Sequence, residues 1–224
     1  MVDRDTGEVK RVYYHNRRYY VAARTGDRYG LRIENDTDGR VLVVLAVDGV
    51  NVISGQTADF NQRGYILSPH QSADINGFRK SETEIAAFRF APAHQSYAAR
   101  TGRPFDVGVI GMAVFRERVP PPPPPPPPMS MAAPKASSAE VAHDSAAQRG
   151  ERLGTAHGEI EHDVSRVAPF EKVTARPESV RLLEYDSTEN LIASGVIPRR
   201  PVPYRPRPFP GHRANDGYVP DPPE

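Results

Sequence analysis

The chain has no cysteine and no long apolar run, and each absence narrows the range of possible functions. Without cysteine the protein has no disulfide framework, no thiol nucleophile and no cysteine metal site. No apolar stretch reaches the roughly 18 residues of a membrane-spanning helix, so the sequence predicts no transmembrane segment. The residues from Met1 to Asp5 also lack the basic and apolar regions of a signal peptide.

The sequence has no large excess of charge of either sign. The residues before Val119 contain 17 Lys and Arg against 14 Asp and Glu, and those from Val119 onward contain 12 against 14. Nucleic-acid-binding domains and proteins of anionic membrane surfaces show a strongly basic face. The charge balance therefore favours neither nucleic acid nor a membrane surface as a partner.

Proline is scarce in the first half, where only Pro69, Pro92 and Pro104 of the 24 prolines precede Val119. Aromatic residues follow the opposite trend, because 13 of the 18 Phe and Tyr lie before Val119. The first half can therefore bury a core, whereas most of the second half cannot offset the entropy of ordering.

This contrast predicts four regions along the chain. They are a folded domain at 1–118, a polyproline and Ala/Ser-rich linker at 119–152, a C-terminal segment at 153–197, and a disordered Pro/Arg-rich tail at 198–224. The nine prolines from Pro120 to Pro128 predict a polyproline II spacer of about 28 Å.

The segment from Arg40 to Gly55 carries the strongest structural signal, because Asp48-Gly49 separates two apolar runs. An Asp-Gly pair between β-branched segments predicts a hairpin with a type I′ turn. The first arm, 41–47, is apolar on both faces and is expected at the centre of a sheet. The second arm, 50–54, is interrupted by polar residues and is expected nearer an edge.

Further short strand patterns recur along the first half, separated by turn residues every 8 to 12 positions or so. This spacing predicts an all-β fold, specifically an antiparallel β-sandwich of seven to nine strands or so. A hairpin turn is expected at Asn76-Gly77, and one helical turn near Ser96 to Arg100. The other expected strands lie at 9–14, 18–22, 29–35, 65–67, 72–75, 78–80, 86–90 and 107–115.

The C-terminal segment contains one strand pattern, from Val180 to Tyr185, followed by a capping-box pattern of Asp186 and Glu189. The latter predicts a short helix that ends near Gly195. A unit this small cannot hold itself together. We therefore expect it to dock on the first domain, where strand addition would protect a sheet edge. The residues expected to cover that edge or face are Val180, Leu182, Leu183 and Tyr185.

Two patterns resemble metal sites. Glu34, Asp36 and Asp38 copy the opening of a calcium loop, but its twelfth position is Leu45 instead of glutamate, so an acidic turn is the better interpretation. His157, Glu159 and Glu161 fall on one side of an extended stretch, yet they lie in a polar region that reads as linker. The sequence therefore predicts no metal and no cofactor.

Catalytic motifs are also missing, since the chain has no nucleophile elbow, P-loop or dinucleotide fingerprint. His15, His70 and His94 are candidate bases for a hydrolase, but loop histidines of an ordinary domain explain them equally well. No residue is assigned a catalytic role.

Two groups of side chains are candidate interaction sites. Tyr13, Tyr14, Tyr19 and Tyr20 offer a stacking surface, from which strand alternation leaves one tyrosine of each adjacent pair exposed. The candidate interaction residues of these two pairs are Tyr14 and Tyr19. Three segments are basic, namely 77–81, which contains Arg79 and Lys80, 100–103 and 17–18. Together they form either an anion-binding surface or a solvated face.

Several motifs between Asp3 and Glu117 resemble an uncharacterised family of bacterial proteins. They are DRDTG at 3–7, VDGVNVISG at 47–55, GYIL at 64–67, GFRKS at 77–81, SYAARTGRP at 96–104 and VGVIGMAVFRE at 107–117. The resemblance implies that the C-terminal segment belongs to the folded unit, and it brings no activity, cofactor or catalytic residue. Many relatives look exported, which supports the hypothesis that the natural start lies upstream of Met1. If it does, the missing residues are expected to include an export signal to the periplasm.

From these observations we expect a non-enzymatic β-sandwich module that binds or scaffolds another macromolecule, with an unidentified protein as its partner. A β-sandwich that binds a carbohydrate or a small molecule through its tyrosines is the alternative. A hydrolase without a recognisable motif is the third hypothesis.

Overall fold

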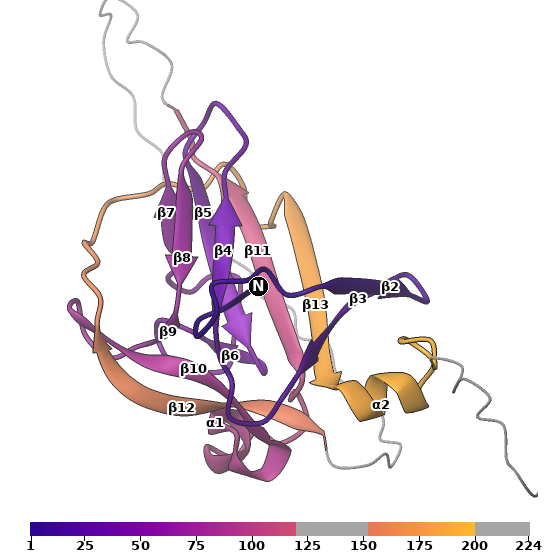
Figure 1. The fold of residues 1–224 in the computed structure, drawn as a ribbon. Coiled ribbons are helices and arrows are strands. Elements are labelled where there is room, and N and C mark those ends of the chain that lie inside the picture. Colours follow the sequence, from indigo (N-terminus) through magenta and orange to yellow (C-terminus); the bar gives the residue numbers. More distant parts are fainter. Residues whose placement is uncertain (120–151, 200–224) are drawn as a thin grey trace, which may run out of the picture.

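The computed structural model describes residues 1–119 and 152–199, which form two packed β-sheets and few helices (Figure 1). The six-stranded sheet contains β1 (Val2–Asp3), β4 (Arg28–Glu34), β8 (Ser72–Ile75), β9 (Gly77–Arg79), β10 (Glu84–Pro92) and β12 (Leu153–His162). The seven-stranded sheet contains β2 (Val12–His15), β3 (Arg18–Ala23), β5 (Val41–Val47), β6 (Val50–Asn51), β7 (Tyr65–Leu67), β11 (Val109–Arg116) and β13 (Ser179–Ser187). The predicted all-β sandwich is confirmed. The polyproline spacer and the tail from residue 200 lie outside the described residues.

All strand pairs are antiparallel except β13 with β3, which is parallel. The seven-stranded sheet runs β2-β3-β13-β11-β5-β6, with β7 also on β5. The helical elements are η1 (Ala93–Gln95), α1 (Tyr97–Arg100) and α2 (Thr188–Ala193). The helical turn predicted near Ser96 is confirmed, with the Ser96 hydroxyl accepting a hydrogen bond from the Ala99 amide.

The central hairpin forms as predicted, because Asp48 and Gly49 both adopt positive φ, at 54° and 71°. Strand β5 lies between β11 on one side and β6 and β7 on the other. The second arm is shorter than the apolar pattern suggests. Its strand stops at Asn51, whose side-chain oxygen accepts hydrogen bonds from the amides of Ile53 and Ser54 and so turns the chain.

The two apolar faces of β5 serve two different clusters. Its odd-numbered residues, such as Val43 and Leu45, belong to the main core between the sheets. Leu42 and Val44 face outward, where Phe115 and the partly buried Phe170 pack against them. Residue 170 comes from the second half of the chain, so that half covers an outer sheet face as well.

The hairpin turn predicted at Asn76-Gly77 is wrong, because β8 and β9 do not pair with each other. Strand β8 pairs with β4 and β9 pairs with β10, so the segment passes from one partner strand to the next. Position 77 requires glycine because no room is left for a side chain. A Cβ there would lie 2.2 Å from the carbonyl oxygen of Ala86. The Asn-Gly pair thus marks a close approach of two backbones.

Both sheets are completed by strands from the second half of the chain. Strand β12, which sequence analysis read as polar linker, pairs with β10 from Pro92↔Leu153 to Glu84↔His162. Strand β13 matches the strand pattern expected at 180–185 and lies between β11 and β3 (Figure 1). The hairpin of β2 and β3 therefore joins the rest of its sheet through β13.

The short helix after β13 exists, but its cap is one residue later than predicted. The Ser187 hydroxyl, and not the Asp186 carboxylate, accepts the hydrogen bond from the Asn190 amide at 3.1 Å. Asp186 instead accepts from the side chain of Asn190 and from the amide of Ser187. Gly195, at φ 78°, ends the helix as expected.

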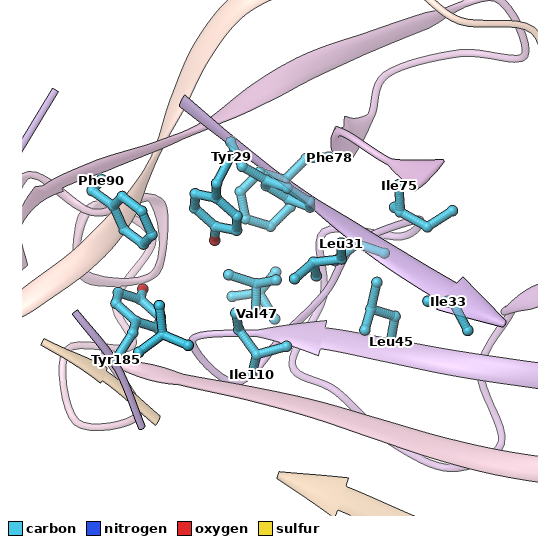
Figure 2. Packing of buried hydrophobic residues seen from close by; sticks show 14 of the residues in the cluster. Tyr29, Leu31, Ile33, Leu45, Val47, Ile75, Phe78, Phe90, Ile110 and Tyr185 are labelled. Carbon is cyan, nitrogen blue, oxygen red and sulfur yellow. The ribbon is translucent and has the colours of Figure 1, made fainter. Parts of the chain in front are cut away.

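The carboxylate of Asp48 is buried in the core and bonded to both halves of the chain. Its oxygens accept hydrogen bonds from the amide of Gly108 (2.9 Å), the amide of Thr155 (2.6 Å) and the hydroxyl of Tyr185 (2.6 Å). The hydroxyl groups of Tyr185, Thr155 and Tyr29 continue the network at 2.7 and 2.6 Å. Figure 2 shows Tyr29 and Tyr185 with their hydroxyl groups turned toward each other.

Replacing Tyr185 with phenylalanine should destabilise the fold, because Asp48 loses one of its three donors while it stays buried. Hydrogen bonds to buried charged groups contribute about 1.5–3 kcal/mol, so we expect a loss of about 2 kcal/mol in urea unfolding. The exposed Tyr14 is the matched control, and Tyr14→Phe should change the stability by less than about 0.5 kcal/mol. Equal stability of Y185F and the wild type would contradict this account of the network.

Burial raises the pKa of Asp48 from 3.8 to about 6, despite the hydrogen bonds from Tyr185, Thr155 and Gly108, which lower it. Between these two pH values the folded state holds more protons than the unfolded state, so this group's contribution to stability falls as the pH rises. Asp3, whose pKa is lowered to about 2 by its hydrogen bond from Lys10, acts in the opposite direction.

Comparison with Asp48→Asn isolates the contribution of this one group. The stability of the wild type relative to D48N should be greater at pH 4.5 than at pH 7, by about 2 kcal/mol for a pKa displaced this far. Urea unfolding of both proteins at a series of pH values measures the difference. A difference that does not change with pH would show that Asp48 titrates normally in the folded protein.

Candidate functional site

Residues 163–172, here called the strap, cross one open end of the sandwich. At one end the amides of Asp163 and Ser165 donate to the carbonyls of Thr83 and Glu82, both at 2.8 Å. At the other end Arg118 donates its amide to the carbonyl of Glu171 at 2.7 Å. In Figure 1 this segment follows β12 and rises beside β7 and β8.

A cleft of about 1040 Å³ lies between the strap and the sandwich, and we call it the strap cleft. Its other walls are the residues of β7 with the loop before it, the end of β8, and the residues that follow β9. Within the described residues β7 pairs only with β5, and β8 only with β4. The second edge of each strand is therefore unpaired in the part of the chain that the structure covers.

The walls of the strap cleft carry more positive than negative side chains. The cations are Arg40, Arg63, Arg79, Lys80, Arg166 and Lys172, and the anions are Asp74, Glu82 and Asp163. Asp74 and Asp163 are already paired, with Arg32 and Arg79. Among the described residues, no ion pair involves Arg63, Lys80 or Arg166, so these three cations set the sign of the potential in the cleft.

Arg79 holds the strap to β9 through two hydrogen bonds. Its terminal nitrogens donate to the main-chain oxygen and to the carboxylate of Asp163, both at 2.6 Å, and only 10% of its side chain is exposed. Tyr65 lies close by: burial raises its pKa, and the charge of Arg79 lowers it. A side-chain hydrogen-bonding contact with Arg79 also lowers the pKa of Tyr65.

The basic segments noted in the sequence are only partly brought together. Arg79 and Lys80 line the strap cleft. The charges of Lys80 and Arg100 both act on His157, whose pKa is lowered first by burial and then by these two cations. Arg18, at the tip of the β2–β3 hairpin, pairs instead with Glu184 at 2.8 Å. A single anion-binding surface built from all three segments does not form.

The tyrosines on the first hairpin form a smaller candidate site. Tyr14 and Tyr19 face each other across β2 and β3, with 5.1 Å between ring centroids and 47° between ring planes. They are 65% and 52% exposed. Tyr13 and Tyr20 are half-buried, as alternation along the strands requires.

The apolar side chains predicted to dock from the C-terminal segment divide between two faces. Tyr185 is fully buried, and Leu183 packs against the main core. Val180 and Leu182 are 48% and 61% exposed on the outer face of the seven-stranded sheet. With Phe60 and Met112 they line a shallow apolar groove of about 320 Å³.

The acidic and histidine patterns noted in the sequence have structural partners. Glu159 pairs with Arg89 of β10, Glu161 pairs with Arg4 just after β1, and His157 stacks on Tyr97. The turn at 35–39 is held by the side chain of Asn35, which donates to the carbonyl oxygens of Gly39 and Ser68. No group of three or more His, Asp or Glu side chains is placed to hold a metal ion in residues 1–119 and 152–199.

The three candidate bases lie on separate loops. His15 ends β2 next to the hairpin turn, His94 lies in η1, and the ring of His70 contacts Asp38 at 3.0 Å on an exposed turn. The hydroxyl of Ser96 caps α1. The three histidines thus lie at separate places in the fold.

Sequence analysis missed Tyr65, Asp163 and Arg166 as site residues. Tyr65 fell within an expected strand, with nothing to mark its hydroxyl as exceptional. Asp163 and Arg166 belong to a segment that has neither strand nor helix signals. An isolated acidic residue and an isolated basic residue in such a segment can be assigned to a site only after the structure shows that the strap crosses the sandwich.

Comparison with protein-family models, with curated proteins and with solved structures finds no match. The resemblance to a bacterial family therefore stays an expectation. In the described part of the chain, no helix is both long and apolar enough to cross a membrane.

Proposed function

We propose that this protein is a non-enzymatic binding module that holds another protein by accepting an extended acidic segment in the strap cleft. The observation that carries the proposal is a cleft of about 1040 Å³ whose unpaired charges are mostly positive. Its volume is at the upper end of the range usual for ligand pockets, about 300–1,000 Å³. It is therefore large enough for several residues of an extended chain.

The charge of the cleft favours an acidic occupant. Arg63 and Arg166 are exposed on its two walls, and Lys80, which is also exposed, lines the cleft just after β9. Complementary charge raises the association rate and disfavours basic competitors, even where each exposed pair contributes little affinity. An acidic segment also avoids the repulsion that a basic one would meet there.

The shape of the walls favours an extended occupant. The unpaired edge of a strand can receive another strand through main-chain hydrogen bonds. Strands β7 and β8 have three and four residues, so each edge suits a short segment. Apolar side chains such as Ile66 and Phe170 lie beside these edges and would contact alternate side chains of the occupant.

Charge reversal of the cleft tests this function. The probe is a fluorescein-labelled peptide of about eight residues in which Glu and Val alternate, with a Ser-Val peptide as its neutral counterpart. Fluorescence anisotropy should show that the wild type prefers the acidic peptide. The double variant Arg63→Glu/Arg166→Glu should bind it about tenfold more weakly at low ionic strength, and the effect should shrink at about 0.15 M salt.

The matched control is Arg17→Glu/Arg24→Glu, which makes the same charge change outside the cleft, at two exposed arginines. If both double variants lose the same affinity, binding follows net charge and the cleft is not the site. If the wild type binds neither peptide, the proposed function is wrong.

A second function, carbohydrate binding, is favoured by one observation, the exposed Tyr14–Tyr19 pair. Aromatic side chains with exposed faces can stack on apolar faces of a ligand. The pair lies on the hairpin of β2 and β3, and β2 forms one end of its sheet. It is separate from the strap cleft in the fold, so the two functions can be tested independently.

For the tyrosine pair, we expect a glycan array probed with the labelled protein to show binding that Tyr14→Ala/Tyr19→Ala removes. The double variant Arg63→Glu/Arg166→Glu should leave any such binding unchanged. Because both tyrosines are exposed, their loss should alter the fold little, and circular dichroism checks this. An array without signal for the wild type counts against this second function.

A further inference from the structure

Two of the three basic segments noted in the sequence meet at His157 of β12. The ring of His157 stacks against Tyr97 of α1, with 5.7 Å between ring centroids, and against Phe78 of β9, with 6.4 Å. Lys80 comes two residues after Phe78, and Arg100 comes three residues after Tyr97. The periods of an extended chain and of a helix place each cation on the same side of its element as the ring. The two rings that contact His157 thus bring one cation each to it.

Both cations and the imidazole are available to a ligand. Lys80 and Arg100 are exposed, and neither makes an ion pair in the part of the chain that the structure describes. Within residues 1–119 and 152–199, the ring nitrogens of His157 make no hydrogen bond. They are also absent from the buried polar atoms that lack a partner, so solvent reaches them although the residue is half-buried.

The charge around His157 is positive and is not balanced by a described carboxylate. Burial lowers the pKa of His157, and the charges of Lys80 and Arg100 lower it further. The acidic residues that follow on the same strand, Glu159 and Glu161, pair with arginines elsewhere, and the residue of β10 opposite His157 is apolar. His157 is therefore neutral at pH 7, with one ring nitrogen that donates and one that accepts.

We propose that His157, Lys80 and Arg100 form a second binding site, which takes a dianionic phosphoryl group. Lys80 and Arg100 donate charge-assisted hydrogen bonds to its oxygens, and the ring of His157 donates a further one. A phosphate monoester carries about −1.5 to −2 charge at pH 7, which two cations match better than they match a single carboxylate. The ligand is either free phosphate or a phosphate monoester, which present the same oxygens.

This site goes beyond the proposed function and can be tested without it. His157 and Arg100 do not belong to the walls of the strap cleft, although Lys80 lines the cleft as well. Variants at positions 157 and 100 therefore leave the cleft unchanged. If the phosphoryl site fails its test, the peptide experiments on the strap cleft are unaffected, and the reverse also holds.

The pKa of His157, measured from its ring signals by NMR, reports whether phosphate binds beside it. An adjacent anion favours the protonated imidazole, so sodium phosphate should raise this pKa by about one pH unit relative to sodium chloride at equal ionic strength. The variant His157→Gln identifies the signal among those of the seven histidines. The same pKa in both salts would overturn the site.

Arg100→Gln distinguishes a binding role from a structural one, because its effects with and without phosphate differ. Without phosphate, loss of the cation removes repulsion, so the pKa of His157 should rise. The phosphate affinity, measured from the saturation of the His157 signals at constant ionic strength, should fall about threefold. Arg17→Gln removes an exposed arginine of the third basic segment and should change neither quantity. An unchanged phosphate affinity of R100Q would refute the site.

Phenyl phosphate and sodium acetate, titrated in the same way, define the ligand. Tighter binding of phenyl phosphate than of inorganic phosphate identifies a monoester as the ligand, and equal or weaker binding identifies free phosphate. Either result supports the proposal. Acetate that binds as tightly as phosphate would overturn the assignment of the site to a dianion.

Discussion

The buried carboxylate of Asp48 is the constraint on which the two-sheet architecture depends. It sits in the turn between β5 and β6, where positive φ suits an Asp-Gly pair, yet its side chain points into the core. A carboxylate can be buried only if donors surround it. Two of its three donors, Thr155 and Tyr185, come from the second half of the chain. The first half alone would leave this charge largely uncompensated.

The direction of the hydrogen bonds follows from that one acceptor. Because an ionised carboxylate only accepts, the Tyr185 hydroxyl must donate to Asp48 and therefore accepts from Thr155. Thr155 in turn accepts from Tyr29, which lies in the same six-stranded sheet as Thr155. The three hydroxyl groups thus all donate in the direction of Asp48. Through them the network links β4, β12 and β13 to the central hairpin. Burial of Tyr29 and Tyr185 keeps their pKa values well above the usual one, so both remain donors.

The sequence revealed features that depend on local chemistry and missed those that depend on tertiary contacts. The Asp48-Gly49 turn and the apolar strand before it follow from backbone preference and burial, so both were predictable. The same turn pattern gave a wrong prediction at Asn76-Gly77. Glycine is needed at position 77 because a side chain would clash with a neighbouring backbone, and not because the chain makes a hairpin turn there. Strand β12 escaped notice because its charged side chains look like those of a solvated linker in the sequence, whereas in the fold Glu159 pairs with Arg89 and Glu161 with Arg4.

The candidate site was predictable only in part for a related reason. Arg79 and Lys80 were marked by their charge, and they do lie in the strap cleft. The cleft itself arises where residues far apart in sequence meet, because Asp163 reaches Arg79 across a separation of 84 residues. No local pattern in a single sequence encodes such a meeting. The position of Tyr65 beside Arg79 is likewise a property of the folded chain, and a tyrosine in a strand pattern is expected to be an ordinary core residue.

Two concave surfaces of the described residues differ in their chemistry, and this difference is why we propose the strap cleft as the binding site. The groove beside Leu182 is apolar and shallow, and nothing in the described residues indicates what covers it. Exposed apolar patches of this size occur on many monomeric proteins. The strap cleft instead combines unpaired strand edges with cations that make no ion pair among the described residues. These features agree on one kind of occupant, because each of them is satisfied by an extended segment that carries a carboxylate.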